Sequence, residues 1–146
     1  MDYSRREIVA LFAATAGAAA QTTQAPAALP TLTSKVYPFD ELPTRTNQQT
    51  GTKGHKVLEG VTHGGFHIES HITELMPGQM PHPPHHHLHE EMILVREGTM
   101  EVTIAGKSAT MGPGSVGFVA SGEEHGWKNV GTGHARYFVM AVGRDT

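Results

Sequence analysis

The sequence predicts an all-β protein in which a single antiparallel domain forms a sandwich or barrel. The first observation is composition, because seventeen Gly and nine Pro among 146 residues indicate many tight turns. The second is pattern, because short apolar or alternating runs follow one another from Val57 onward, separated by turn residues. The third is that no segment after residue 30 carries a long apolar period of 3.6 residues, so helix is a minor component.

The expected strands are read from the apolar runs and the turns that end them. The run from Phe66 alternates and stops at Pro77-Gly78, and the run from Met100 to Ile104 alternates with polar residues and stops at Ala105-Gly106. Lys35 to Glu59 is less patterned and either packs across the barrel or adds an edge strand. The strands predicted are therefore residues 66–76, 92–95, 100–104, 116–119 and 137–142, with another that His125 opens.

Size and charge limit the kinds of protein that this chain can be. A length of 146 residues suits one domain and can hold an ordinary hydrophobic core. The absence of cysteine excludes a disulfide framework and thiolate metal ligands. The net charge of −3, without a run of Lys and Arg, argues against nucleic acid as a partner.

The N-terminus resembles a bacterial export signal. A charged start is followed by an apolar stretch and by Ala18-Ala19-Ala20, which offers a cleavage site. We therefore expect a signal peptide over 1–20, a linker over 21–34 and the folded domain over 35–146. The apolar stretch of 8–20 is too short to span a bilayer, so we expect no stable membrane span after processing.

Arg5 and Arg6 make this signal similar to a twin-arginine leader, which carries folded proteins to the periplasm. Ile8 and Val9 stand where that signal prefers large apolar residues. Glu7 and Ala10 depart from the usual pattern. The sequence thus predicts a periplasmic protein exported by the twin-arginine route.

Five of the eleven histidines lie between His82 and His89, so the histidines are concentrated in one segment. Side chains on a strand alternate between faces, and His85 and His87 therefore point the same way. Glu91 joins that face if the strand is regular or if a bulge returns it. Two imidazoles and a carboxylate on one face are ligands of a borderline-hard cation. The best candidate for a fourth ligand is His125, which follows a turn.

The two stretches together resemble the paired motifs of the cupin superfamily. The first motif is Gly78, His85-His86-His87, Glu91 and Gly98, with one residue more than usual between Gly78 and His85. The second motif is Gly114, Ala120-Ser121-Gly122, His125 and Asn129, in which Ala120 replaces the usual Pro. The resemblance covers about residues 75–142.

The resemblance implies a metal site and a fold. The residues that match the metal ligands of the family are His85, His87, Glu91 and His125. Asn129 matches a residue that lies in a turn or in the outer shell of the metal. The implied fold is an antiparallel, double-sheet, jelly-roll-like cupin barrel with the metal inside. The resemblance also implies a homodimer, formed through the N-terminal strand region.

The remaining histidines are expected outside the ligand set. His82, His86 and His89 are interpreted as residues of the mouth or surface. In an unbroken strand His89 would share the face of His85 and His87, so the prediction requires a bulge or turn after His87. His63, His67 and His71 are read as ordinary exposed residues, although His67 and His71 share a strand face and could line the cavity.

The predicted cofactor is one divalent metal ion, with iron or manganese favoured and nickel, cobalt, zinc or copper as alternatives. Four protein ligands leave about two octahedral positions open, as a catalytic site needs. The first hypothesis is therefore a metal-dependent enzyme of the dioxygenase or oxidoreductase type acting on a small organic molecule. The alternatives are a non-catalytic cupin that binds a metal or small ligand, an isomerase, decarboxylase or lyase, and a metal buffer.

Overall fold

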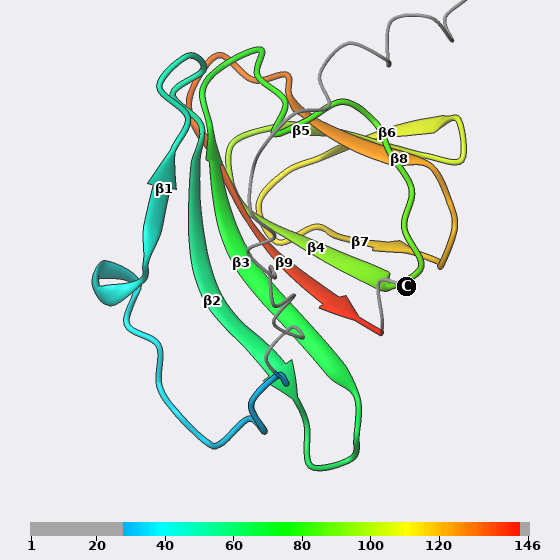
Figure 1. Ribbon diagram of the computed structural model, residues 1–146. Helices are drawn as coiled ribbons and strands as arrows, with labels where there is room; N and C mark the ends of the chain where they lie inside the picture. Colours follow the sequence, from blue (N-terminus) through cyan, green and yellow to red (C-terminus); the bar gives the residue numbers. More distant parts are fainter. Residues whose placement is uncertain (1–27, 144–146) are drawn as a thin grey trace, which may run out of the picture.

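Two antiparallel sheets face each other in a computed structural model of the chain, which describes residues 28–143 (Figure 1). The larger sheet has six strands in the order β1-β2-β3-β9-β4-β7, and the smaller has the order β6-β5-β8. The large sheet consists of β1 (Thr44–Thr46), β2 (Lys53–Val61), β3 (His67–Leu75), β9 (Ala135–Val142), β4 (Glu90–Glu97) and β7 (Val116–Val119). The small sheet consists of β6 (Lys107–Met111), β5 (Met100–Ile104) and β8 (His125–Asn129), and a short 3-10 helix, η1, spans Phe39–Glu41.

The all-β fold class predicted from the sequence is confirmed, and the expected strands are all present within a few residues of their predicted limits. Residues 35–59, which the sequence left open, supply edge strand β1 and most of β2. The one strand that the sequence did not indicate is β6. Its first four residues are exposed and polar or small, so it lacks the apolar alternation that marks a half-buried strand.

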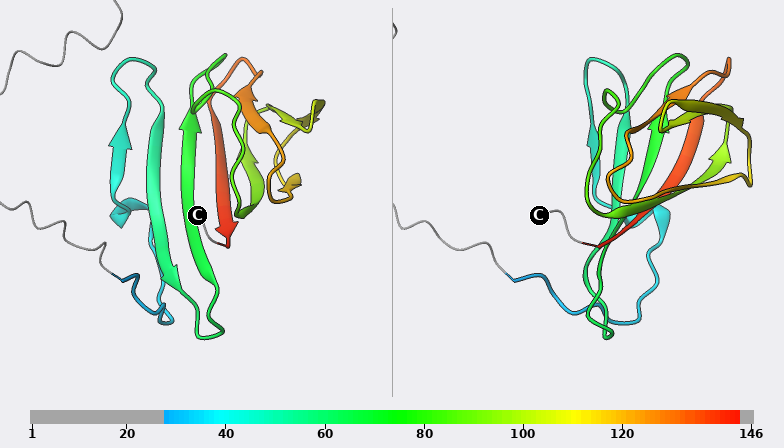
Figure 2. Two further views of the ribbon diagram at one scale, coloured as in Figure 1. Left: turned by 45° about the vertical axis from the view of Figure 1, so that its right-hand side comes forward. Right: turned by 90° about the vertical axis from the view of Figure 1, so that its right-hand side faces the viewer.

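The core fills the end of the barrel where β9 begins. Inward residues alternate with outward ones along β9, so Ala135, Tyr137 and Val139 are buried and their neighbours are not. They pack with inward residues of both sheets, among them Leu75, Ile93, Val95, Met100, Val102 and Trp127. The opposite end of the barrel, around Ala141, is left for a cavity. Figure 2 shows the two sheets from the side, with the small sheet closing over the curved large one.

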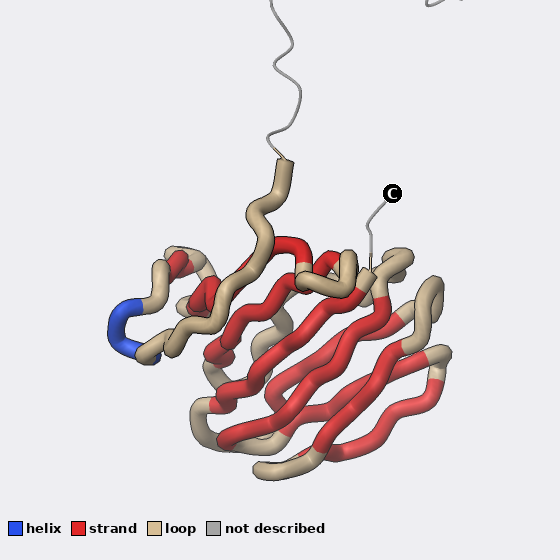
Figure 3. Tube along the Cα trace, turned by 90° about the horizontal axis from the view of Figure 1, so that it is seen from below, coloured by secondary structure: helices blue, strands red, loops and turns tan. Residues whose placement is uncertain are grey.

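The outer face of the large sheet is apolar. Strand pairing places Met92 opposite both Phe118 and Met140, and Leu94 opposite both Val116 and Phe138. Val116 and Phe118 are each 54% exposed, and Met92 is 46% exposed. The solvent face of an antiparallel sheet is commonly polar. These rows of apolar side chains on β4, β7 and β9 form what we call the outer apolar face. Figure 3 shows the strands of the fold, in red, from below.

The expected leader over 1–20 and residues 21–27 of the linker over 21–34 lie outside the described residues. From residue 28 the chain runs beside β2, where Thr31 pairs with Val61 in an isolated parallel bridge. Among residues 28–143, no helix has the length and apolar character needed to cross a membrane.

Candidate metal centre

The histidine-rich segment is the connection from β3 to β4, and it is tied to the start of β8. His85 and His125 exchange two backbone hydrogen bonds, of 3.0 Å and 2.8 Å, in an isolated antiparallel bridge. The amide of Gly122 donates a third hydrogen bond, of 2.9 Å, to the carbonyl oxygen of His87. These bonds bring His85 and His87 beside His125, although the segments are far apart in the sequence.

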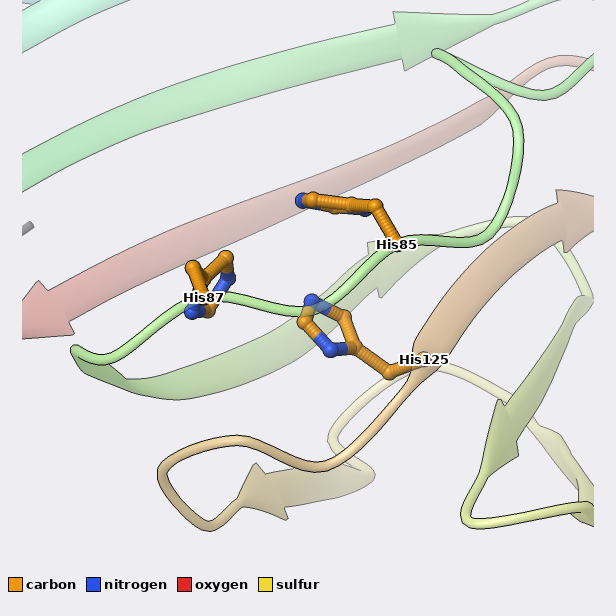
Figure 4. A group of neighbouring side chains, drawn as sticks. All are labelled: His85, His87 and His125. Atoms are coloured by element: carbon orange, nitrogen blue, oxygen red, sulfur yellow. The ribbon is translucent and has the colours of Figure 1, made fainter.

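The three imidazoles converge on one point (Figure 4). Ring centroids lie 5.2 Å apart for His85 and His87, 4.7 Å for His85 and His125, and 4.6 Å for His87 and His125. One nitrogen from each ring lies within 4.8 Å of the other two. Such a set can hold a metal ion.

Glu91 brings a carboxylate to the same place. It is the second residue of β4, points inward and is only 7% exposed. Its Oε2 atom lies 2.8 Å from Nε2 of His87 and 3.2 Å from Nε2 of His125. Neighbouring ligands of an octahedral ion with bonds of about 2.1 Å are separated by about 3 Å, so both distances fit a shared metal. Glu91 thus lies against two of the three imidazoles that the sequence predicted as ligands.

The hydrogen bonds of the Nδ1 atoms of His87 and His125 place a proton on Nδ1, as binding of a metal at Nε2 requires. Nδ1 of His87 lies 2.9 Å from the carbonyl oxygen of His89, and Nδ1 of His125 lies 2.9 Å from that of Glu123. A carbonyl oxygen only accepts, so each Nδ1 carries a proton, and in the neutral ring each Nε2 presents a lone pair. Both lone pairs then face the Glu91 carboxylate, which is also an acceptor. A metal ion between them would satisfy all three groups, and without one a proton on Nε2 of His87 would be donated to Glu91 across their 2.8 Å separation.

Two further atoms support this interpretation. Nε2 of His125 and Nδ1 of His85 are buried, and neither has a hydrogen-bond partner among the described residues. The contact between His125 and Glu91 is close but lacks hydrogen-bond geometry. Burial, followed by the neighbouring His82, His125 and His87, lowers the pKa of His85 to about 4. The ring is therefore neutral near pH 7, as a metal ligand must be.

The other histidines of the segment are placed differently from the four. The chain breaks from strand geometry between His87 and β4, as the prediction for His89 required. The His89 ring stacks on that of His87 at a centroid distance of 3.4 Å and lines the cavity. His87, His89 and Glu91 form a second set whose ligand atoms lie within 4.8 Å of one another. His82 and His86 are exposed, although the His82 ring contacts that of His85.

A cavity of about 370 Å³ opens beside this centre. The β3–β4 connection lines it with His82, His85, His87 and His89, and the large sheet contributes Glu69, His71, Thr73, Glu91, Tyr137, Val139 and Ala141. Trp127 lines the cavity and contacts the His125 ring at 5.0 Å, so it serves both the core and the site. Burial raises the pKa of Tyr137 above its usual range, which keeps its phenol protonated.

Sequence reasoning missed part of this lining. Glu69, Thr73 and Tyr137 were not singled out, and His71 was read as an ordinary exposed residue. The available signal was the alternation of polar residues at positions 67, 69, 71 and 73, which is unusual for the inner face of a barrel. His63 is exposed, as expected.

Asn129 holds a turn. Its side-chain amide donates to the carbonyl oxygens of Leu75 and Gly133, at 3.1 Å and 2.9 Å, and its Oδ1 atom accepts from the Gly131 amide at 3.0 Å. The side chain is fully buried. Of the two roles that the resemblance implied for Asn129, these contacts give it the one in the turn.

A larger hollow, of about 450 Å³, lies between residues 30–43 and β2. Its lining contains Lys35, Lys56, Glu41 and Glu59 but no histidine. It therefore lacks the donor set that distinguishes the cavity beside His85.

Comparisons with known proteins agree with this architecture. Residues 71–141 match the family model described as a cupin domain. No curated protein matches the chain significantly. Three similar solved structures are the polyketide cyclase RemF from Streptomyces resistomycificus, KdgF from Halomonas sp., and a cupin-superfamily sugar phosphate isomerase from Silicibacter pomeroyi.

RemF is 23% identical with a TM-score of 0.62, over 77% of this chain and 82% of that one. KdgF is 18% identical with a TM-score of 0.63, over 77% and 97%. The isomerase is 16% identical with a TM-score of 0.61, over 75% and 76%. At these identities the likeness establishes the fold. The protein thus has the fold of these cupin structures, its residues 71–141 match the cupin-domain model, and it contains a His/Glu cluster compatible with a metal site.

Proposed function

We propose that this protein binds one divalent metal ion through His85, His87, Glu91 and His125 and acts as a metal-dependent enzyme on a small organic molecule. The observation that carries the proposal is the convergence of two Nε2 atoms on the buried Glu91 carboxylate, because neutral rings in this tautomer would set acceptor against acceptor unless a cation lies between them. Four protein ligands leave coordination positions free on the cavity side, where a small molecule can bind.

The metal, when bound, supplies Lewis-acid chemistry and, if it is iron or manganese, redox chemistry. The residues of the chain supply the rest. The carbonyl oxygens of His89 and Glu123 hold the His87 and His125 rings in place, and Trp127 and Tyr137 shape the cavity. Three imidazoles and one carboxylate suit iron or manganese, and this favours an oxidoreductase of the dioxygenase type.

A non-catalytic cupin that binds a metal or a small ligand is the second candidate, and an isomerase, decarboxylase or lyase is the third. The specific observation that favours the third over the second is that the cavity wall opposite the metal carries ionisable groups, Glu69 and His71. The test begins with metal analysis of protein purified from its native compartment. A stoichiometry near one ion per chain is expected, whereas several ions per chain would favour a metal buffer.

Oxygen consumption by the metal-loaded protein then separates the enzyme classes. The panel contains phenols, diketones and hydroxy acids. Oxygen uptake with one of them supports the dioxygenase type, and conversion without oxygen uptake supports the third candidate. Binding without conversion across the panel supports the second.

We further propose a homodimer in which the outer apolar face packs against a second copy. Exposed Met92, Val116 and Phe118 in registered rows support this face, because water is a poor solvent for a contiguous apolar patch. The face differs from the N-terminal strand region, which the family resemblance implies. Export to the periplasm by the twin-arginine route remains a proposal that rests on Arg5, Arg6 and the apolar stretch after them.

A further inference from the structure

Strand β3 presents a second ionisable pair to the cavity, separate from the four candidate ligands. Glu69 and His71 lie on its inner face, and both line the cavity that the metal histidines line from the other side. We propose that His71, positioned by Glu69, is the proton acceptor for a small metal-chelating carbonyl compound that binds between it and the metal. This inference rests on the proposed metal-dependent function and names its substrate class and its acid–base group.

The strand register places the pair at a useful distance from the metal. Glu69 pairs with Ala141, and Ala141 pairs with Glu91, so the two carboxylates stand in one row with one strand between them. Neighbouring strands are about 4.8 Å apart, so about 10 Å separates the Cα atoms of Glu69 and Glu91. In the next row His71 pairs with Val139, which pairs with Ile93.

The floor between the metal and the pair is low and apolar. It is made by Val139 and Ala141, whose side chains are small and which line the cavity. Figure 4 shows β9 running beside the three histidines, with β3 on its far side, and the cavity lined by Val139 and Ala141 lies at this place. A molecule of a few heavy atoms that chelates the metal therefore lies over this floor, with its far side toward His71.

The environment of His71 suits a base. Its Nδ1 atom lies 3.8 Å from Oε1 of Glu69, which is too long for a direct hydrogen bond but close enough for the carboxylate to stabilise a protonated ring. Nε2 is left to meet the substrate. Burial lowers the pKa of His71, so the ring is neutral and able to accept a proton near neutral pH.

Charged groups on several elements face His71. Glu69 on its own strand and Glu91 on β4 favour its protonated form, and His82 in the β3–β4 connection opposes it. Lys56 on β2 is its register partner but pairs with Glu59. With Glu91 engaged as a metal ligand, Glu69 is the carboxylate that stabilises the proton that His71 receives.

The proposed step is a proton transfer that needs no oxidant. A C–H bond beside the chelating carbonyl breaks, its proton moves to Nε2 of His71, and its electron pair is delocalised onto the carbonyl oxygen. Return of the proton to a different atom gives an isomer, and return to the same carbon gives exchange with solvent. The substrate class is therefore a small chelating carbonyl compound with an acidic C–H, such as a 2-oxo acid.

The experiment uses the zinc-loaded full chain with pyruvate in D2O as the probe, and follows deuterium incorporation at the methyl group by NMR. His71→Gln keeps the size and polarity of the side chain but removes the base. We expect the exchange kcat to fall about 100-fold or more while zinc content and KM stay within about threefold. The matched control is His63→Gln, an exposed histidine in the turn between β2 and β3, which should exchange like the wild type.

A second, equilibrium measurement is independent of turnover. Acetohydroxamic acid chelates zinc as its anion, so its binding must place one proton somewhere. Calorimetry near pH 6.5 in two buffers of different ionisation enthalpy counts the protons released. The wild type should release fewer protons than His71→Gln, by up to one per site, because His71 retains the proton.

The outcomes separate this inference from the proposed function. Wild-type protein that binds no zinc overturns both. Zinc-loaded wild type that exchanges no deuterium, or a His71→Gln variant that exchanges at the wild-type rate with the wild-type proton count, overturns the role of His71 and leaves the metal site standing. Glu69→Gln should show a smaller loss of exchange than His71→Gln, and an equal or larger loss would assign the proton to Glu69 instead.

Discussion

Oε2 of Glu91 lies 2.8 Å from Nε2 of His87, and both atoms are acceptors when the ring is neutral and its proton is on Nδ1, facing the His89 carbonyl oxygen. The same carboxylate oxygen faces Nε2 of His125 at 3.2 Å. A buried carboxylate without a proton donor or cation is costly. The arrangement therefore has a direct consequence for metal affinity.

Removal of either partner should abolish tight metal binding. His87→Ala and Glu91→Ala each delete a ligand, and we expect divalent metal affinity to fall by well over the roughly 100-fold that marks an outer-shell change. His86→Ala is the control, because His86 is exposed and belongs to neither ligand set. Equilibrium dialysis with metal analysis measures all three, and equal losses from His86 and His87 would show that the assignment is wrong.

The metal-free protein should lose stability as the pH falls from about 6.5 toward 4. The folded pKa of His85 is lowered to about 4, whereas the unfolded ring titrates near 6.5. Across this window the unfolded chain binds the proton more readily, so protonation favours unfolding. Urea denaturation in chelator at several pH values tests this, and His85→Gln should flatten the slope. An unchanged slope would mean that His85 is protonated equally in both states.

Asn129→Ala should destabilise the fold and spare the metal. It leaves the carbonyl oxygens of Leu75 and Gly133 and the amide of Gly131 without their side-chain partner, and each such buried group costs about 1–3 kcal/mol. We expect the free energy of unfolding to fall by at least about 2 kcal/mol, with metal affinity within about threefold of the wild type. A loss of metal affinity with unchanged stability would assign Asn129 to the metal site.

A charged residue on the outer apolar face should dissociate the proposed dimer. Phe118→Lys places a cation among Met92 and its neighbours, and burying that charge opposes association. Sedimentation velocity should show a dimer for the wild type and a monomer for the variant. Val36→Lys offers the comparison, because Val36 is 81% exposed and lies away from that face. A monomeric wild type would refute the interface.

The route of export should determine which metal the protein carries. A twin-arginine leader would deliver the chain folded, with a metal chosen in the cytoplasm, whereas an unfolded chain would meet periplasmic copper or zinc first. Replacing the leader, with its Arg5-Arg6 pair, by a conventional signal should therefore change the metal found by mass spectrometry in periplasmic protein. The same metal from both leaders would show that export route has no influence.

The parts of the fold that the sequence predicted are those with a local signal. Alternation along β5 and β9 and the turn at Pro77-Gly78 are properties of neighbouring residues, and the structure confirms them. β6 was missed because its partner β5, and not its own side chains, makes it a strand. The grouping of His85, His87, Glu91 and His125 was reached through spacing and family resemblance together.

The place of His71 could not be deduced in the same way. Whether a half-polar strand turns Glu69 and His71 toward a cavity or toward water depends on which face the other sheet covers, and that is a property of strand pairing across the whole chain. His67, four residues before His71, is partly buried but lies outside the cavity lining. The pattern alone treated the two alike.

The backbone bridge between His85 and His125 means that the candidate centre joins two chain segments, which three main-chain hydrogen bonds connect beside the candidate ligands and two more connect at Asn129. A metal ion bound by residues of both segments would hold the two segments together. Amide protons of His85, Gly122 and His125 should then exchange with solvent quickly in the empty protein and slowly in the filled one. Amide hydrogen exchange would thus report whether the site holds a metal ion, even when the substrate of the protein is unknown.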